Sequence, residues 1–189
     1  MKLTFQKDDL LNGINIVLKA VPSKTTMPIL ECILIDASDN QIKLTANDME
    51  LGIETKVEGS ILSKGKIALD AKLLSEIIRK LSGGESDITI ESDDKYNTTI
   101  TCDNSVFHIQ GKNGDEFSYL PFIEKDHFIC LSQFTLKEVI RQTLFSISVN
   151  DSNKMMTGEL FQVTDNELKV VSLDGHRMSI RKVELKDHY

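Results

Sequence analysis

The residues of this chain best suited to chemistry lie close together near its C-terminal end. Asp174 and His176 are two residues apart and Arg177 follows them, so a carboxylate, an imidazole and a guanidinium could meet in one turn. An aspartate–histidine pair of this kind could move a proton. No nucleophile is paired with it by spacing, however, so an acyl- or group-transfer site is incomplete. We therefore interpret the segment as non-catalytic and keep a small α+β hydrolase or transferase as an alternative.

Other residues with chemical potential also lack the required patterns. Gly65-Lys66 and Gly111-Lys112 resemble the end of a phosphate-binding loop, but neither has the earlier glycine or the Ser/Thr after the lysine. The four histidines have no metal-ligand spacing. The three cysteines are odd in number and widely spaced, which excludes a CxxC site and favours reduced, buried thiols in a cytosol. The sequence therefore predicts no metal and no cofactor.

Composition excludes several classes of protein. The chain has 189 residues, of which 40% are hydrophobic, and a net charge of -7 from 22 Lys and Arg against 29 Asp and Glu. This apolar content is too high for a disordered chain. No apolar run reaches the roughly 18 residues of a membrane span, and the alternating start of the sequence shows no signal peptide. We expect a folded, cytoplasmic protein without a membrane partner.

Three amphipathic helices are predicted from apolar residues at helical spacing. They cover about 7–21, 71–81 and 133–147, and Asp70 and Ser132 are suited to cap the second and third. A short strand is predicted before each helix, from alternating apolar residues at Leu3 and Phe5, Ile67 and Leu69, and Ile129 and Leu131.

The apolar residues of the helices recur at a fixed interval. Three sets lie 63 residues apart: Leu10, Leu73 and Leu136; Ile14, Ile77 and Ile140; Leu18, Leu81 and Leu144. The segment 39–57 also aligns without a gap to 165–183, at twice this interval. Its apolar alternation shifts by one residue in the later copy, which predicts a bulge or insertion near Gly175. A period of this kind indicates internal duplication.

The repeated unit predicts the architecture. Each unit reads as a strand, a helix and about three strands in hairpin order, so two units form a two-layer α+β domain with helices together on one sheet face. We expect a first domain at 1–123, from units at about 1–62 and 63–123, with a connector near 121–126. Residues 127–189 would be a third unit without a partner, and the chain looks cut short after it.

Charge is distributed unevenly between helices and the rest of the chain. The three predicted helical segments, together with Asp70, carry seven basic and five acidic residues, whereas the whole chain is acidic. Weakly basic helices on an acidic shell suit a protein whose helices face a polyanion.

Taken together, these features resemble the bacterial DNA polymerase III beta subunit family, the replicative sliding clamps. The similarity runs over the whole chain and rests on four segments: Met1-Lys2-Leu3-Thr4, Thr26-Met27-Pro28-Ile29-Leu30, Ala46-Asn47-Asp48-Met49-Glu50 and Leu173-Asp174-Gly175-His176-Arg177-Met178. The resemblance implies a non-catalytic processivity factor that encircles duplex DNA, with helices lining the hole and antiparallel sheets outside. It also implies a homodimeric ring when the protein is full length, and this chain lacks the third of the family's three domains.

The resemblance assigns roles to particular residues. It implies sequence-independent DNA-backbone contacts at Lys24, Lys72 and Asn150. It implies a groove for a short peptide of the DNA polymerase III alpha subunit, the clamp loader and other clamp-binding proteins, formed by Met156, Leu173, Gly175, His176, Arg177 and Met178. It implies a ring interface at Leu74, Ile78, Phe107 and Ile109. Leu173 departs from the family's usual threonine, and a peptide-docking or dimerising module without DNA binding stays an alternative.

Overall fold

The computed structural model divides into two compact units, Met1–Phe122 and Ile123–Tyr189. It describes residues 1–81, 87–118, 128–149 and 153–189. The expected connector near 121–126 therefore lies outside the described residues, and so do Gly83 and Gly84, which the sequence predicts as the end of the second helix. No helix in the described ranges is long and apolar enough to cross a membrane.

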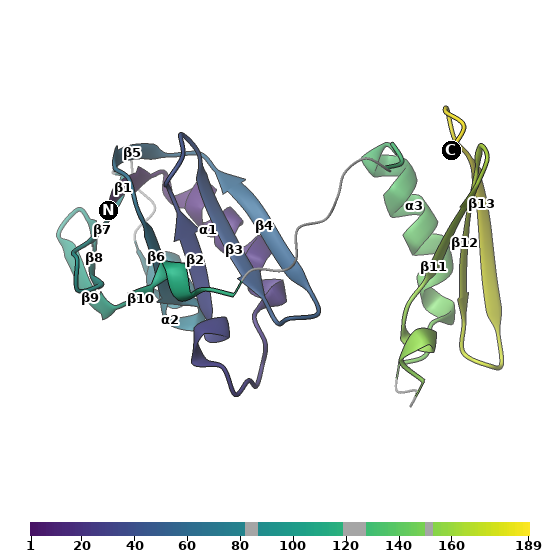
Figure 1. Cartoon of the computed structure of the whole chain (residues 1–189), viewed down its shortest axis with the longest axis horizontal. Coiled ribbons are helices and arrows are strands. Elements are labelled where there is room, and N and C mark those ends of the chain that lie inside the picture. Colours follow the sequence, from purple (N-terminus) through teal and green to yellow (C-terminus); the bar gives the residue numbers. More distant parts are fainter. Residues whose placement is uncertain (82–86, 119–127, 150–152) are drawn as a thin grey trace. The chain divides into compact units, whose positions relative to one another are not determined.

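The described residues of the first unit form two helices and ten strands, and Figure 1 shows how they are arranged. The first repeat contains β1 (Lys2–Phe5), α1 (Lys7–Val17), β2 (Cys32–Asp36), β3 (Ile42–Asn47), β4 (Gly52–Val57) and β5 (Ser60–Ser63), with 3-10 turns η1 (Leu18–Ala20) and η2 (Pro28–Glu31). The second contains β6 (Lys66–Asp70), α2 (Ala71–Lys80), β7 (Ile88–Ser92), β8 (Asn97–Cys102), β9 (Ser105–Gln110), β10 (Lys112–Asn113) and η3 (Gly114–Glu116). The predicted order of a strand, a helix and then further strands is present in both, with four strands after each helix instead of about three.

The two repeats exchange the strand that precedes each helix. One five-stranded sheet has the order β5-β1-β7-β8-β9 and the other has the order β10-β6-β2-β3-β4. β1 of the first repeat pairs antiparallel with β7 of the second, and β6 of the second repeat pairs antiparallel with β2 of the first. Each sheet therefore contains strands of both repeats, and neither repeat is complete without the other.

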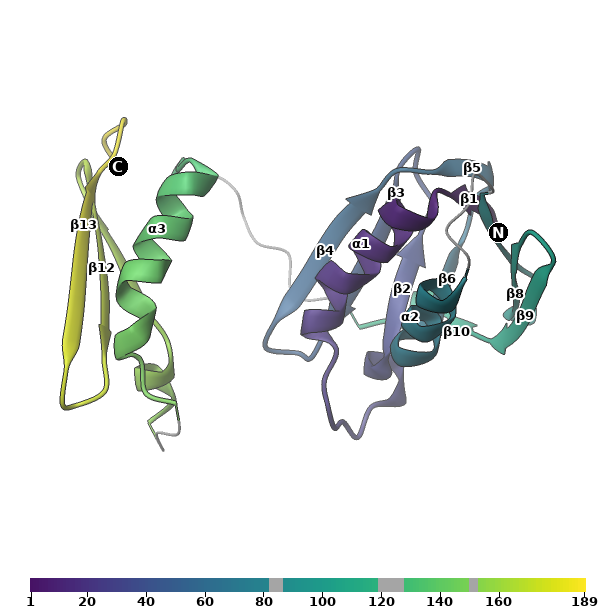
Figure 2. The ribbon, with the colours of Figure 1, turned by 180° about the vertical axis from the view of Figure 1, so that it is seen from behind.

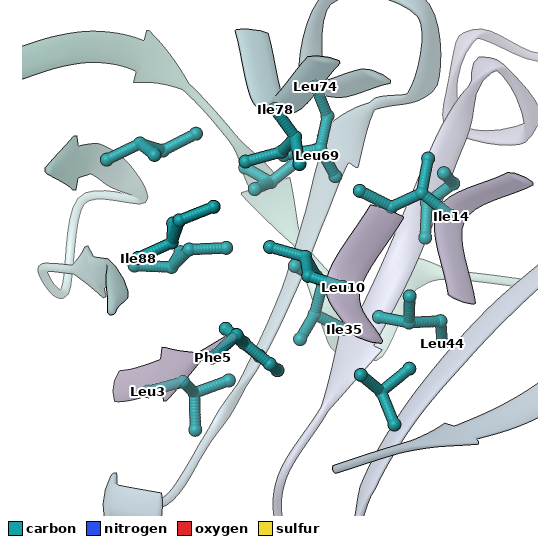
Figure 3. Packing of buried hydrophobic residues seen from close by; sticks show 14 of the residues in the cluster. Leu3, Phe5, Leu10, Ile14, Ile35, Leu44, Leu69, Leu74, Ile78 and Ile88 are labelled. Carbon is teal, nitrogen blue, oxygen red and sulfur yellow. The ribbon is translucent and has the colours of Figure 1, made fainter. Parts of the chain in front are cut away.

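The two helices pack against each other and cover the inner face of both sheets. α1 and α2 lie on the same side of β2, β3 and β4 (Figure 2). Leu10 and Ile14 of α1 and Leu74 and Ile78 of α2 are fully buried in one cluster that also takes side chains from both sheets (Figure 3). The predicted α+β architecture, with paired helices on sheets, is confirmed.

The fixed interval of 63 residues is wrong in detail. The helices begin at Lys7, Ala71 and, in the second unit, Gln133, so their starts are 64 and then 62 residues apart. Leu74 rather than Leu73 is the counterpart of Leu10, and Leu73 is exposed. Because α2 has leucine at both 73 and 74, the residue type alone does not show which one corresponds to Leu10. Their burial does, since Leu74 is buried and Leu73 is exposed.

In the second unit, residues 128–149 and 153–189 form one α-helix and one sheet. α3 (Gln133–Thr143), η4 (Leu144–Ser146) and η5 (Lys154–Thr157) precede β11 (Leu160–Thr164), β12 (Glu167–Leu173) and β13 (Met178–Glu184), which pair in that order. A small core of Val139, Leu168, Val170 and Leu185 joins the helix to the sheet. Asp70 and Ser132 accept the predicted N-cap hydrogen bonds of α2 and α3.

The strand predicted at Ile129 and Leu131 does not form. Residues 128–132 contain no strand, although Ile129 and Leu131 pack against the small core of this unit. In the first unit, the equivalent strands β1 and β6 are each paired with the other repeat's sheet. No strand of the described residues pairs with residues 128–132, and a strand without partners gains no ladder hydrogen bonds.

Candidate DNA-facing lysines and peptide cleft

Lys24 and Lys72 are both exposed on the first unit. Lys72 lies in the first turn of α2, and Lys24 lies in the loop between η1 and η2. Neither ammonium group has a hydrogen bond or an ion pair to another residue of the described ranges, so both are available to a ligand. Asn150, the third predicted DNA contact, lies outside the described residues.

Other basic side chains of the two helices differ in their availability. Lys7 donates hydrogen bonds to the carbonyl oxygens of Arg79, at 3.5 Å, and of Leu81, at the C-terminal end of α2. A cation at this place offsets the partial negative charge of the helix end. Lys19 and Lys80 are exposed and have no recorded partner in the described ranges. Lysines near the helix ends therefore differ: Lys7 is hydrogen-bonded, whereas Lys19 and Lys80 are free among the described residues. Counting charges on the predicted helices does not reveal this difference.

A tight turn between β12 and β13 is organised by Asp174. The Oδ1 atom of Asp174 accepts hydrogen bonds from the backbone N–H groups of His176 and Arg177, each at 3.0 Å. The Oδ2 atom accepts from Nε of Arg177 at 2.9 Å. The hydrogen bonds from the backbone of His176 and from Arg177 hold the pKa of the Asp174 carboxyl below its ordinary value. This carboxylate is therefore a structural acceptor, which leaves the acid–base interpretation without support.

The first unit contains the same turn, 126 residues earlier. Asp48 accepts hydrogen bonds from the backbone N–H groups of Glu50 and Leu51, at 2.9 and 2.7 Å. Each turn is closed by a backbone hydrogen bond, from Asp48 to Leu51 and from Asp174 to Arg177. Met49 has φ 76° and Gly175 has φ 85° at the equivalent position. The two turns therefore have the same length and backbone shape.

The predicted bulge or insertion near Gly175 is therefore wrong. β12 and β13 pair residue by residue from Leu173 and Met178 onward, without a shift. Ser179 takes the place of Ile53 on the inner face, and its hydroxyl is 2.7 Å from that of Ser146. Met178 and Ile180 lie exposed on the other face. The apolar alternation of the two copies therefore differs because a serine stands where the first copy has an isoleucine. The strand register is the same in both copies.

A shallow cleft of about 260 Å³ opens beside this turn. It is lined by Leu173, Gly175, His176, Arg177 and Met178, which are five of the six residues predicted for a peptide groove. Arg177 and Met178 are exposed, so a guanidinium and a thioether are both accessible. The sixth residue, Met156, is half-buried on η5 and does not line this cleft, although its carbonyl accepts a hydrogen bond from the backbone of Ser148 at 2.8 Å.

The residues predicted for a ring interface fall into two groups. Leu74 and Ile78 are fully buried between α1, α2 and the sheets, so they have no surface to offer a partner and belong to the core. Phe107 and Ile109 alternate along β9 and are only partly buried. Within the described ranges, no group of three or more His, Cys, Asp or Glu side chains could hold a metal ion.

Comparisons with known proteins cover nearly the whole chain. Residues 1–121 match the family model described as the N-terminal domain of the DNA polymerase III beta subunit, and residues 130–189 match the model of its central domain. The chain is 38% identical over 193 residues to the beta sliding clamp of Bacillus subtilis, which covers 98% of the chain and 50% of the relative. It is 35% identical over 195 residues to that of Staphylococcus epidermidis, covering 99% and 51%.

Solved structures agree with these matches. A crystal structure from Eubacterium rectale, described as a DNA polymerase III beta subunit, superposes with a TM-score of 0.93 at 63% identity, over 100% of this chain and 51% of that one. The sliding clamp of Bacillus subtilis superposes with a TM-score of 0.91 at 36% identity, over 100% and 52%. The chain thus spans about half the length of the curated relatives it matches.

Proposed function

Because the chain belongs to the DNA polymerase III beta subunit family, we propose that it is part of a DNA sliding clamp. Such a clamp is a processivity factor without a reaction of its own, which surrounds duplex DNA and tethers the replicative polymerase. The observation that carries the proposal is the pairing of α1 and α2 on one side of the sheets, with unpaired lysines at Lys24 and Lys72. We propose residues 1–123 as the first clamp domain and 127–189 as the first half of a second.

The weakness of the proposed DNA contacts suits a sliding protein. Each lysine that neutralises a phosphate releases counterions and adds a sequence-independent increment of affinity. Many such contacts would hold the protein at one place, whereas a few leave it mobile along the duplex. Lys24 and Lys72, with Asn150 as a third contact, supply a small number of backbone contacts and no base readout.

We propose the cleft beside Asp174 as the docking site of a short linear peptide of the polymerase alpha subunit, the clamp loader and other clamp-binding proteins. Leu173 and Met178 offer apolar surface, and a methionine side chain adapts to differently shaped partners. Arg177 can donate hydrogen bonds to peptide carbonyls or a carboxylate. Met156 would extend the groove if the peptide reaches η5. Phe107 and Ile109 are the proposed apolar contacts to a second subunit in the ring.

The DNA-binding part of this proposal is tested by the salt dependence of duplex binding. Lys24→Ala and Lys72→Ala should each weaken binding of a fluorescent duplex and reduce the slope of log affinity against log salt by about 1. Lys56→Ala is the matched control, because Lys56 is exposed and points to the outer face of β4, opposite Lys43. Equal effects of all three substitutions would contradict the proposal. Peptide binding without duplex binding would favour the docking module instead.

A further inference from the structure

A cavity of about 520 Å³ lies in the first unit and shares no residue with the proposed peptide cleft or the proposed DNA contacts. It opens where β4, the edge strand of one sheet, leads into β5, the edge strand of the other (Figure 1). Its floor is apolar, because Ile42 and Val57 are only 2% and 8% exposed. Its rim is exposed and carries the polar side chains, at Asn40, Gln41, Lys56, Glu58 and Lys64.

The second unit has a smaller cavity at the same place in its repeat. That cavity measures about 240 Å³, and its five lining residues are the counterparts, 126 residues later, of five that line the first cavity. They are Asn166, Glu167, Lys182, Val183 and Glu184, which correspond to Asn40, Gln41, Lys56, Val57 and Glu58. The chain therefore contains an internal reference for the charges of the first cavity.

The two cavities differ at a position that changes their charge. In the second unit, Oε1 of Glu167 lies 2.9 Å from Nζ of Lys182 and neutralises it. In the first unit, the uncharged Gln41 stands at the position of Glu167. Within the described ranges, the ammonium group of Lys56 has no hydrogen bond or ion pair. Two lysines and one glutamate line the first cavity, whereas one lysine and two glutamates line the second, so the first has a positive lining and the second a negative one.

Lys64 provides a second cationic group at the same cavity. Its Nζ atom donates a hydrogen bond to Oδ1 of Asn40 at 3.1 Å, which fixes the ammonium group at the rim. An ammonium group has three donors, so Lys64 keeps two for a ligand. Both lysines line the cavity together with Ile61 and Leu62 of β5, and Leu62 is 61% exposed. A matching ligand therefore carries anionic groups beside an aliphatic one.

We propose that this cavity docks an extended peptide segment of a partner protein, in which an aliphatic side chain lies between two acidic ones on the same face. The carboxylates pair with Lys56 and Lys64, and the aliphatic side chain covers Ile61 and Leu62. A polypeptide fits better than a small molecule, because small-molecule pockets enclose most of their ligand and the rim here is exposed. The aliphatic wall favours a peptide over a nucleic acid, whose phosphates would meet the lysines alone. The proposal does not depend on DNA binding or on the cleft beside Asp174.

A chemical-shift titration of the whole chain tests the proposal, because it identifies the amides that a peptide contacts. The probe is acetyl-Glu-Ser-Leu-Ser-Glu-amide, since alternate side chains of an extended strand share one face. At millimolar concentration it should shift amides of the cavity and not those of 173–178. The same peptide with glutamine for both glutamates should bind about tenfold more weakly, because both ion pairs are lost. No shifts at the cavity, or equal binding of the two peptides, would overturn the proposal.

Gln41→Glu is the decisive variant, because it restores in the first unit the carboxylate that neutralises Lys182 in the second. It should weaken binding of the acidic peptide about fivefold without destabilising the first unit, and Lys56→Ala should weaken binding by a similar factor. Glu58→Gln removes the carboxylate from the lining and should strengthen binding instead. Unchanged affinity in Gln41→Glu, or weaker binding in Glu58→Gln, would contradict the charge argument.

Lys43→Ala is the matched control for Lys56→Ala. Lys43 lies opposite Lys56 on the neighbouring strand, pairs with Glu54 at 3.3 Å and does not line the cavity, so its loss should leave peptide affinity unchanged. Equal effects of the two substitutions would overturn the proposal. Duplex binding distinguishes this cavity from the proposed DNA contacts, because Lys56→Ala should not change it. A loss of duplex affinity in Lys56→Ala without a loss of peptide affinity would assign the cavity to a nucleic acid and refute the peptide site.

Discussion

Two glycines of the second unit allow the cost of the turn beside Asp174 to be measured directly. A Cβ atom added to Gly175 or to Gly158 would meet nothing within 4 Å. Gly175 has φ 85°, in the left-handed region, whereas Gly158 has φ -129° and ψ 178°, an extended conformation that any residue adopts. Alanine at the two positions therefore differs in backbone strain and not in packing.

The expected effects have opposite signs. Replacing glycine by alanine in a compatible conformation stabilises a protein by about 0.4–1 kcal/mol, because the unfolded chain loses freedom. A residue with a Cβ in the left-handed region costs about 1–2 kcal/mol. Gly158→Ala should therefore raise the free energy of unfolding of the second unit by about 0.5 kcal/mol, and Gly175→Ala should lower it by about 1 kcal/mol.

Native-state hydrogen exchange of the β12 and β13 amides is the appropriate assay, because it reports on the second unit separately from the first. The opening constant of these amides should rise about fivefold in Gly175→Ala and fall about twofold in Gly158→Ala. Asparagine, which tolerates positive φ better than alanine, should be milder at position 175. Equal shifts of the same sign in the two alanine variants would refute the conclusion that backbone strain governs this turn.

Three further predictions concern the cleft, the core and pH. Arg177→Ala should weaken binding of a polymerase-derived peptide about tenfold in calorimetry with unchanged circular dichroism, and unchanged affinity would remove Arg177 from the proposed groove. Gly13→Ala should destabilise the first unit by about 1 kcal/mol in urea unfolding despite its better helix propensity, because the new Cβ would overlap Val57, and Val57→Ala should relieve the clash. The Asp174 pKa is lowered in the folded protein, so the stability it provides is present above its unfolded pKa near 4 and lost as pH falls through the folded value. Asp174→Asn should abolish this acid-dependent loss of amide protection in the turn, and a loss that persists would assign it to another group.

Local features of the fold could be predicted from the sequence. The three helices, the N-caps at Asp70 and Ser132 and the hairpin turns depend on residues close in sequence, and their apolar spacing and side-chain oxygens indicate them directly. The last predicted turn of the first and third helices is 3-10 rather than α-helical, at η1 and η4. Helix ends tighten in this way without a clear sequence signal.

Features that depend on distant residues could not be predicted in the same way. β1 pairs with β7 of the second repeat, and β6 pairs with β2 of the first. This exchange depends on which strands of the other repeat have an unpaired edge, and the residues of β1 and β6 themselves do not show it. Residues 128–132 also depend on distant residues. Their apolar alternation predicts a strand, but a strand forms only where another strand is available to pair with it. Leu74 and Ile78 are a similar case. Both are fully buried in the core of this chain, and the sequence does not distinguish an apolar core residue from an apolar interface residue.

The central claim, that this chain is part of a clamp held on DNA by topology, is tested most directly by comparing circular with linear duplex. The assay uses the longest natural polypeptide that contains this sequence, loaded on nicked circular DNA and followed by gel filtration before and after the circle is cut. The account predicts that the protein remains with the closed circle and is lost when the DNA is linearised. Equal retention on both forms, or rapid loss from the intact circle, would contradict it.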